Sequence, residues 1–291
     1  MRIYLAFTVL SSIVVCFGDF VQDQTKLLKC KIKTLQNREK ICNLQEQKIN
    51  DEGFAIVPSK FGEEVKIFEV FWNREVEFLP EQIAKTFPNL IRYHVILCAI
   101  KRVDEKHFHG LLRLESLELK QNEVETIASD SFKDLKKLKH LDLKYNKIKF
   151  IDAKWFESLT HLKHLTLHSN EIEFLNEKSF EKLTNLQSIH LSDNKLKSIP
   201  GNVFKNNLKL QVIWLHDNNI ENIISSMFDY LTELKNVDLR SNICMNRTYR
   251  KDSSGTLFKS YPICDLKKDL EESNCTMTII NEFNLSSVSF F

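Results

Sequence analysis

Histidine is the residue type of this chain with the most scope for chemistry. The chain has nine histidines, and His140 and His164 stand 24 residues apart while His168 and His216 stand at twice that interval. Histidine changes its charge near neutral pH, transfers protons and binds metal ions. A fold that gathers these residues could therefore form a catalytic site, a metal site or a binding surface.

None of the motifs that would indicate an enzyme is present. The sequence has no G-x-S-x-G, H-E-x-x-H, P-loop or G-x-G-x-x-G pattern. We therefore predict no catalytic residue, no cofactor and no metal site. Lys and Arg number 41 against 39 Asp and Glu, too balanced for the basic field on which nucleic-acid binders depend. A surface that binds another protein is the remaining use for the histidines.

A repeat of 24 residues runs through the middle of the chain, and its fold must position the histidines. One asparagine recurs without a slip, at Asn122, Asn146, Asn170, Asn194, Asn218 and Asn242. One phenylalanine does the same, at Phe108, Phe132, Phe156, Phe180, Phe204 and Phe228. Each unit reads L-x-x-L-x-L-x-x-N-x-I-x-x-I and then F-x-x-L. The phenylalanine column accounts for the high content of 21 Phe, against 3 Trp and 6 Tyr.

Each column of the repeat has a physical role. The L-x-L segment alternates with period two, which predicts a short strand with its leucines buried. Successive units should stack these strands about 4.8 Å apart into one parallel sheet. The asparagine amide should satisfy backbone groups of the neighbouring unit, and the phenylalanine should fill the side opposite the sheet. Both columns are therefore predicted to be structural.

This pattern resembles the leucine-rich repeat family over residues 66–242, and in particular the insect-type extracellular members related to Toll and Slit ectodomains. The resemblance implies an α/β repeat: a leucine-rich repeat solenoid with a curved parallel sheet on its concave face, irregular or short helical segments on its convex side, and disulfide-closed caps. We assign about eight units to residues 66–243. The first is degenerate because Asn73 stands one place ahead of the asparagine column. Cys98 replaces Asn in the next unit and is predicted to be a buried free thiol.

Residues 1–18 have the pattern of a secretory signal peptide. Arg2 precedes an apolar run from Ile3 to Val15, and small residues stand before a cleavage site after Gly18. The alternative is a membrane anchor, but the run is shorter than the roughly 20 apolar residues that a span needs. We therefore predict a secreted, extracellular protein without a membrane span.

Six cysteines follow the predicted signal peptide, an even number that suits disulfides in an oxidising compartment. Residues 19–65 are predicted to form an N-terminal cap, in which Cys30 and Cys42 bracket a segment suited to a disulfide-closed hairpin. Residues 244–275 resemble the C-terminal caps of secreted insect-type relatives, for which we pair Cys244 with Cys275. Cys264 could replace Cys275 in that pair, or could join two copies of the chain in a homo-oligomer.

Three N-glycosylation sequons begin at Asn246, Asn274 and Asn284. All three lie beyond the repeats, so glycans there would stay off the sheet. Disulfide formation at Cys275 would compete with glycan transfer at Asn274. The tail, residues 276–291, carries no pattern that indicates a role.

The outward positions of each strand are the third, fifth and seventh of its unit, and six of the nine histidines fall in them. Acids in the fifth column precede bases in the seventh at Glu118/Lys120, Asp142/Lys144 and Asp238/Arg240, which predicts self-neutralised pairs of little energy. The predicted partner-binding residues are His140, Asp142, His164, Thr166, His168, His190, Trp214 and His216. The alternative is a polar solenoid face on which histidine is merely tolerated.

The function implied by the resemblance is recognition. We expect a secreted module that binds a protein ligand or receptor on its concave sheet, in innate immunity or extracellular signalling. The alternative is a structural glycoprotein of the extracellular matrix without a sensing role. Neither function involves catalysis, nucleic acid or a membrane span.

Overall fold

The computed structural model describes residues 27–28, 31–37, 39–44, 55–56, 62–250, 261–262, 266 and 269. The predicted signal peptide and tail lie outside these residues, as do Cys30, Cys264, Cys275, Asn274 and Asn284. Cys42 and Cys244 are disulfide-bonded. Because their predicted partners fall outside the described residues, the pairings remain predictions.

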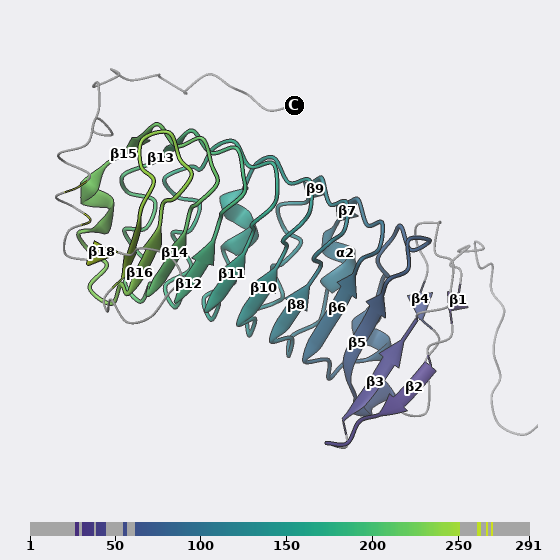
Figure 1. Ribbon diagram of the computed structural model, residues 1–291. Helices are drawn as coiled ribbons and strands as arrows, with labels where there is room; N and C mark the ends of the chain where they lie inside the picture. The colour runs from purple at the N-terminus through teal and green to yellow at the C-terminus, as the bar shows by residue number, and fades with distance from the viewer. Residues whose placement is uncertain are drawn as a thin grey trace, which may run out of the picture.

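One sheet of twelve strands organises the described part of the chain, which is elongated (Figure 1). From the C-terminal to the N-terminal edge its strands are β18 (Tyr261–Pro262), β17 (Thr248–Arg250), β16 (Asn236–Asp238), β14 (Val212–Trp214), β12 (Ser188–His190), β11 (His164–Thr166), β10 (His140–Asp142), β8 (Ser116–Glu118), β6 (Arg92–Ile96), β5 (Val65–Phe71), β3 (Lys40–Asn43) and β2 (Lys31–Thr34).

The 24-residue period is the register of this sheet. From β6 to β16 every pair of neighbours is parallel, and each residue pairs with the one 24 positions further on, as Ser116 does with His140 and Ser188 with Val212. The β5–β6 pair is offset by 25 instead, with Ile67 opposite Arg92. This extra residue explains why Asn73 stands one place ahead of the asparagine column.

The return side of the solenoid has little regular structure. It carries the short strands β7 (Arg102–Val103), β9 (Thr126–Ile127), β13 (Ser198–Ile199) and β15 (Asn222–Ile223), while β1 (Leu27–Leu28) pairs with β4 (Ala55–Ile56). The helical turns are α1 (Ile83–Thr86), α2 (Glu105–Phe108), η1 (Gly62–Glu64), η2 (Ala153–Phe156) and η3 (Ser225–Phe228). Within the described residues, no helix has the length and apolar character needed to cross a bilayer.

The asparagine column satisfies the backbone, as predicted. The Oδ1 of Asn194 accepts a hydrogen bond from the backbone N–H of Ile172, one unit earlier, at 3.0 Å. Its Nδ2 donates to the carbonyls of Leu167, Leu191 and Ser192. The same pattern recurs at the other five asparagines of the column. Each asparagine thus ties two successive units together.

The phenylalanine column forms the predicted buried spine. All six rings are buried, and successive rings such as Phe156, Phe180 and Phe204 lie 6.0 and 5.9 Å apart between centroids. Tyr93 and Phe68 extend the stack into the first two units. The spine and the inward leucines form one continuous core along the solenoid.

Antiparallel strands close both ends of the parallel sheet. At the N-terminal end β2 and β3 form a hairpin, and β3 then pairs in parallel with β5. At the C-terminal end β17 runs antiparallel to β16. The Tyr249 ring of β17 is fully buried, and its hydroxyl donates to Asp269 at 2.8 Å. These elements cover the hydrophobic ends that an open stack of repeats would expose.

Candidate functional site: the open face of the sheet

The sheet register places the predicted binding residues side by side on the open face of the sheet. His140 of β10 pairs with His164 of β11, and Thr166 pairs with His190 of β12. His190 in turn pairs with Trp214 of β14. The buried residue between the outward positions of each strand is a leucine or isoleucine. The alternation of these strands therefore sends the imidazoles and the indole outward together.

The rings on this face contact one another across the strands. The His168 ring lies 4.3 Å from that of His190 between centroids, and the His190 ring lies 4.8 Å from the Trp214 ring and 6.0 Å from the His216 ring. Tyr145 packs edge-on against His168 at 4.8 Å. We call His140, Tyr145, His164, His168, His190, Trp214 and His216 the ring patch.

Tyr145 belongs to the ring patch but is not among the residues predicted from sequence. It occupies the position directly before the asparagine column, where the chain adopts a positive φ in every unit, here 55°. This left-handed turn projects the side chain at the rim of the sheet, beside the seventh column. The signal in the sequence is an aromatic residue directly before Asn146.

Short hydrogen bonds orient the imidazoles. His164 Nδ1 lies 2.7 Å from the Ser188 hydroxyl, and His190 Nε2 lies 2.6 Å from the Ser192 hydroxyl. His216 Nδ1 lies 2.6 Å from Asp217 Oδ2. Ser188 lies on the next strand, Ser192 follows His190 in the same unit, and Asp217 lies at the rim of the sheet. They hold the rings in fixed orientations, which pre-organises the patch for a partner.

Partial burial keeps most of the ring patch uncharged at neutral pH. Burial lowers the pKa of His140, His164 and His168, and a nearby lysine or histidine lowers each further. Burial, with the neighbouring His168 and His216, lowers the pKa of His190 to about 3. The ring patch therefore has a neutral, aromatic centre.

Charged residues on either side of the ring patch neutralise each other. At the ends of β8 and β10, Lys120 lies 2.6 Å from Glu118, and Lys144 lies 3.6 Å from Asp142. On β16 the Arg240 guanidinium makes several bonds to Asp238, the shortest 2.6 Å long. The predicted acid–base pairs are thus formed. Asp142 lies in this flanking network, while Thr166 lies between β10 and β12, paired with His190 of the ring patch.

The remaining histidines have structural surroundings or lie apart from the ring patch. His107 is buried in α2, where its Nδ1 accepts from the backbone N–H of Asp104 at 2.9 Å, and burial lowers its pKa to about 4. His94 is held beside Glu118 at 3.6 Å, and burial lowers its pKa. His109 contacts Asp134, and His161 is exposed.

Metal ligands do not gather in the part of the chain that the structure describes: no three His, Cys, Asp or Glu side chains there are arranged to hold an ion. Cys98 is fully buried and free, as predicted, and burial raises the pKa of its thiol to about 11. A thiol in this state is a poor ligand and a poor nucleophile.

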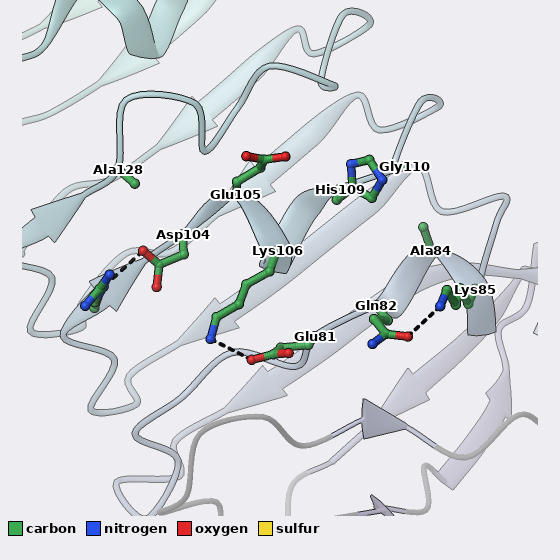
Figure 2. Close-up of a pocket in the computed structure, with 11 residues that line it drawn as sticks. Glu81, Gln82, Ala84, Lys85, Asp104, Glu105, Lys106, His109, Gly110 and Ala128 are labelled. Carbon is green, nitrogen blue, oxygen red and sulfur yellow. Dashed lines mark hydrogen bonds and ion pairs between the residues drawn. The ribbon is translucent and has the colours of Figure 1, made fainter. Parts of the chain in front are cut away.

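A cavity of about 760 Å³ lies on the return side, where α1 and α2 approach each other (Figure 2). Charged side chains line it, but they bond to one another: Lys106 to Glu81 at 2.7 Å and Arg102 to Asp104 at 3.0 Å (Figure 2). The Lys85 ammonium likewise donates to Gln82. With these charges already paired, the cavity offers less to a ligand than the ring patch does.

Comparison with known families identifies the repeats. The family model described as leucine rich repeat matches residues 97–148, 137–196 and 184–243, which together cover half of the chain. This chain belongs to the leucine-rich repeat family. The sequence has no significant match among curated proteins.

Two solved leucine-rich repeat structures show the same fold. A TLR13–ssRNA13 complex superposes with a TM-score of 0.58 at 23% identity, over 65% of this chain and 29% of that one. An internalin, InlF from Listeria monocytogenes, superposes with a TM-score of 0.52 at 21% identity, over 69% of this chain and 54% of that one. This leucine-rich repeat chain thus spans about a third to a half of the length of these neighbours.

Proposed function

We propose that this protein is a secreted binding module that recognises a protein ligand or receptor through the ring patch, in innate immunity or extracellular signalling. The observation that carries the proposal is a neutral cluster of contacting imidazole and aromatic rings, flanked by the ion pairs Glu118–Lys120 and Asp238–Arg240. No part of this role requires catalysis.

The ring patch has the composition of an interface centre. Protein interfaces are depleted of charge at their core and rich in aromatic residues, with polar groups around the rim. Tryptophan is prominent among the residues that carry most of the binding energy. Trp214 lies against His190, and the ion pairs of β8, β10 and β16 surround the patch. Trp214 is therefore the expected anchor.

A protein partner is favoured over a nucleic acid. The TLR13 neighbour was solved in complex with ssRNA13, and phosphate backbones are bound mainly by unpaired Lys and Arg. On this sheet Lys120, Lys144 and Arg240 are each paired with an acid. These three bases, which flank the ring patch, are therefore not free to bind a phosphate backbone.

Secretion is supported by the apolar N-terminal run and by the disulfide-bonded state of Cys42 and Cys244, since such bonds persist in oxidising compartments. We propose the pairs Cys30–Cys42 and Cys244–Cys275, closing the two caps. Asn246, a proposed glycan site, lies at the C-terminal end of the repeats, where its side chain accepts from the backbone N–H of Ser241.

The test is capture of partners from extracellular fluid on immobilised protein. Wild type is compared with Trp214→Ala and His190→Ala, and with Phe174→Ala, which removes a ring that is 61% exposed on the return path after the asparagine column. A partner lost with the first two variants and retained by the third supports the proposal. If all three variants retain the partner and the protein is deposited into extracellular matrix, the structural matrix role is favoured instead.

A further inference from the structure

Two histidines of the ring patch hold their Nδ1 atoms as donors. His216 Nδ1 lies 2.6 Å from the Asp217 carboxylate, which can only accept, so the proton of that bond is on Nδ1. In its neutral form His216 then has a lone pair on Nε2. The tautomer follows from the hydrogen-bond network alone.

His168 Nδ1 is a hydrogen-bond donor as well. The Ser169 hydroxyl donates its one proton to Asp193 Oδ2 at 2.6 Å. Its oxygen must therefore accept the bond from His168 Nδ1, which is 2.9 Å away. The Asp193 carboxylate thus fixes the His168 imidazole through the Ser169 hydroxyl. In its neutral form His168, like His216, then has a lone pair on Nε2.

Both lone pairs are available to a partner. Neither Nε2 atom has a hydrogen-bond partner among the described residues, and neither is among the buried atoms that lack one. Both rings contact His190, which lies against Trp214. The face thus presents two hydrogen-bond acceptors beside a stacking surface.

Negative charge accompanies these acceptors. Asp193 and Asp217 are exposed at the rim, and within the described residues neither forms an ion pair with a lysine or arginine. The nearest bases on neighbouring strands, Lys144 and Arg240, are held by Asp142 and Asp238. This part of the face therefore carries an excess of negative charge, whereas the whole chain is slightly basic at +2.

We propose that the ring patch binds an arginine side chain within a basic segment of the partner, a proposal that rests on the function given above. The guanidinium stacks on Trp214 and His190 and donates to the Nε2 atoms of His168 and His216, with Asp193 and Asp217 neutralising its charge. Arginine fits better than lysine because it is planar, stacks on aromatic faces and carries five donors in one plane. An acidic partner would meet lone pairs and carboxylates and be repelled.

The probe is a set of tetrapeptides of arginine, lysine, citrulline and glutamate, titrated into the full protein at neutral pH. Citrulline keeps the shape of arginine without its charge. Tetra-arginine should bind about tenfold more tightly than tetra-citrulline, since a charge-assisted contact contributes about one power of ten in affinity. Trp214→Ala should weaken tetra-arginine binding about threefold to thirtyfold, the range of a cation–π contact.

Matched variants distinguish binding at the ring patch from non-specific attraction between a cationic peptide and the acidic residues of the protein. Asp217→Asn and Glu221→Gln each remove one exposed negative charge, but only Asp217 adjoins the ring patch. The first should weaken tetra-arginine binding and the second should not. Equal effects of the two variants, equal binding of tetra-lysine, or tighter binding of tetra-glutamate would each overturn the proposal.

A second measurement tests the tautomers directly. Nitrogen-15 spectra of histidine-labelled protein should show a protonated Nδ1 and an unprotonated Nε2 for His168, and protonation at Nε2 would contradict the proposal. If the arginine probe fails while capture of the natural partner still requires Trp214, the ring patch binds a partner of another chemistry. If capture does not require Trp214, the proposed function itself is wrong.

Discussion

The imidazole rings of His140 and His164 stack face to face, with centroids 4.8 Å apart and planes within 10° of parallel. The two residues pair in register on β10 and β11, so the separation is that of two neighbouring strands. Stacked rings at this distance cannot both be charged without strong repulsion. Burial lowers both pKa values, and the proximity of His140 lowers that of His164 further.

Acidification should therefore destabilise the protein. The pKa values of His140, His164, His168 and His190 are all lowered on folding, that of His190 to about 3. In the unfolded chain these histidines have a pKa of about 6.5. Below that pH the unfolded chain therefore binds more protons than the folded one. The stability that these neutral histidines contribute should thus be fully present above about pH 6.5. The free energy of unfolding should fall as the pH drops from about 6.5 toward 3.

The contribution of His190 can be isolated by urea unfolding at pH 7 and pH 5. His190→Gln should reduce the loss of stability between these two values by about 1–2 kcal/mol. The groups that face His190 are His168, His216, Lys144 and Asp238. His161→Gln, a change at an exposed histidine, is the control. An unchanged pH dependence in the His190 variant would show that its ring takes up protons as freely as in the unfolded chain.

Adjacent asparagines test the role of the asparagine column. Asn218 is buried and bonds to Leu191, Leu196 and Leu215, whereas Asn219 is exposed. Asn218→Ala leaves these backbone groups unpaired and should lower the free energy of unfolding by roughly 1–3 kcal/mol. Asn219→Ala should have little effect. Equal melting temperatures for the two variants would contradict a structural role for the column.

Two phenylalanines of one unit test the spine in the same way. Phe180 is fully buried between Phe156 and Phe204, while Phe174 is 61% exposed. Phe180→Ala should cost about 3–5 kcal/mol of stability through the cavity it leaves, and Phe174→Ala should stay within about 0.5 kcal/mol of wild type. Denaturant unfolding measures both, and a small effect at Phe180 would contradict close packing of the spine.

Cys98 should resist alkylation in the native protein. Its thiol is buried, and its pKa is raised to about 11, so little thiolate forms at neutral pH. Iodoacetamide at neutral pH should modify it only after denaturation, as mass spectrometry of the Cys98 peptide would show. Rapid modification of the native protein would mean that the strand ends near β6 open readily.

The periodic part of the fold could be predicted from the sequence because each column repeats one physical requirement many times. The leucine, asparagine and phenylalanine columns identified the strands, the turns and the spine. The register then followed, and with it the pairing of His140 with His164 and of His190 with Trp214.

What could not be predicted depends on side-chain orientation. Nothing in the spacing indicates that Ser169 passes a hydrogen bond from His168 to Asp193, or that Tyr145 packs on His168. The contact between the His168 and His190 rings, 4.3 Å apart between centroids, likewise depends on how the two side chains are turned. The offset of 25 residues between β5 and β6, by contrast, is visible in the sequence as the displaced Asn73.

The most direct test of recognition through the ring patch is a glycan placed on it. Thr166→Asn with His168→Thr creates a sequon in the middle of the patch, and Thr126→Asn with Ala128→Thr creates one on the return side at β9. The affinity of the captured partner is then measured for both glycosylated proteins and for Thr166→Gln with His168→Thr, which loses the same imidazole but carries no glycan and should retain part of the binding. We predict that the first glycan abolishes binding and the second leaves it within about twofold of wild type, a difference below 0.5 kcal/mol. Binding that survives the glycan at position 166 would contradict recognition through the ring patch.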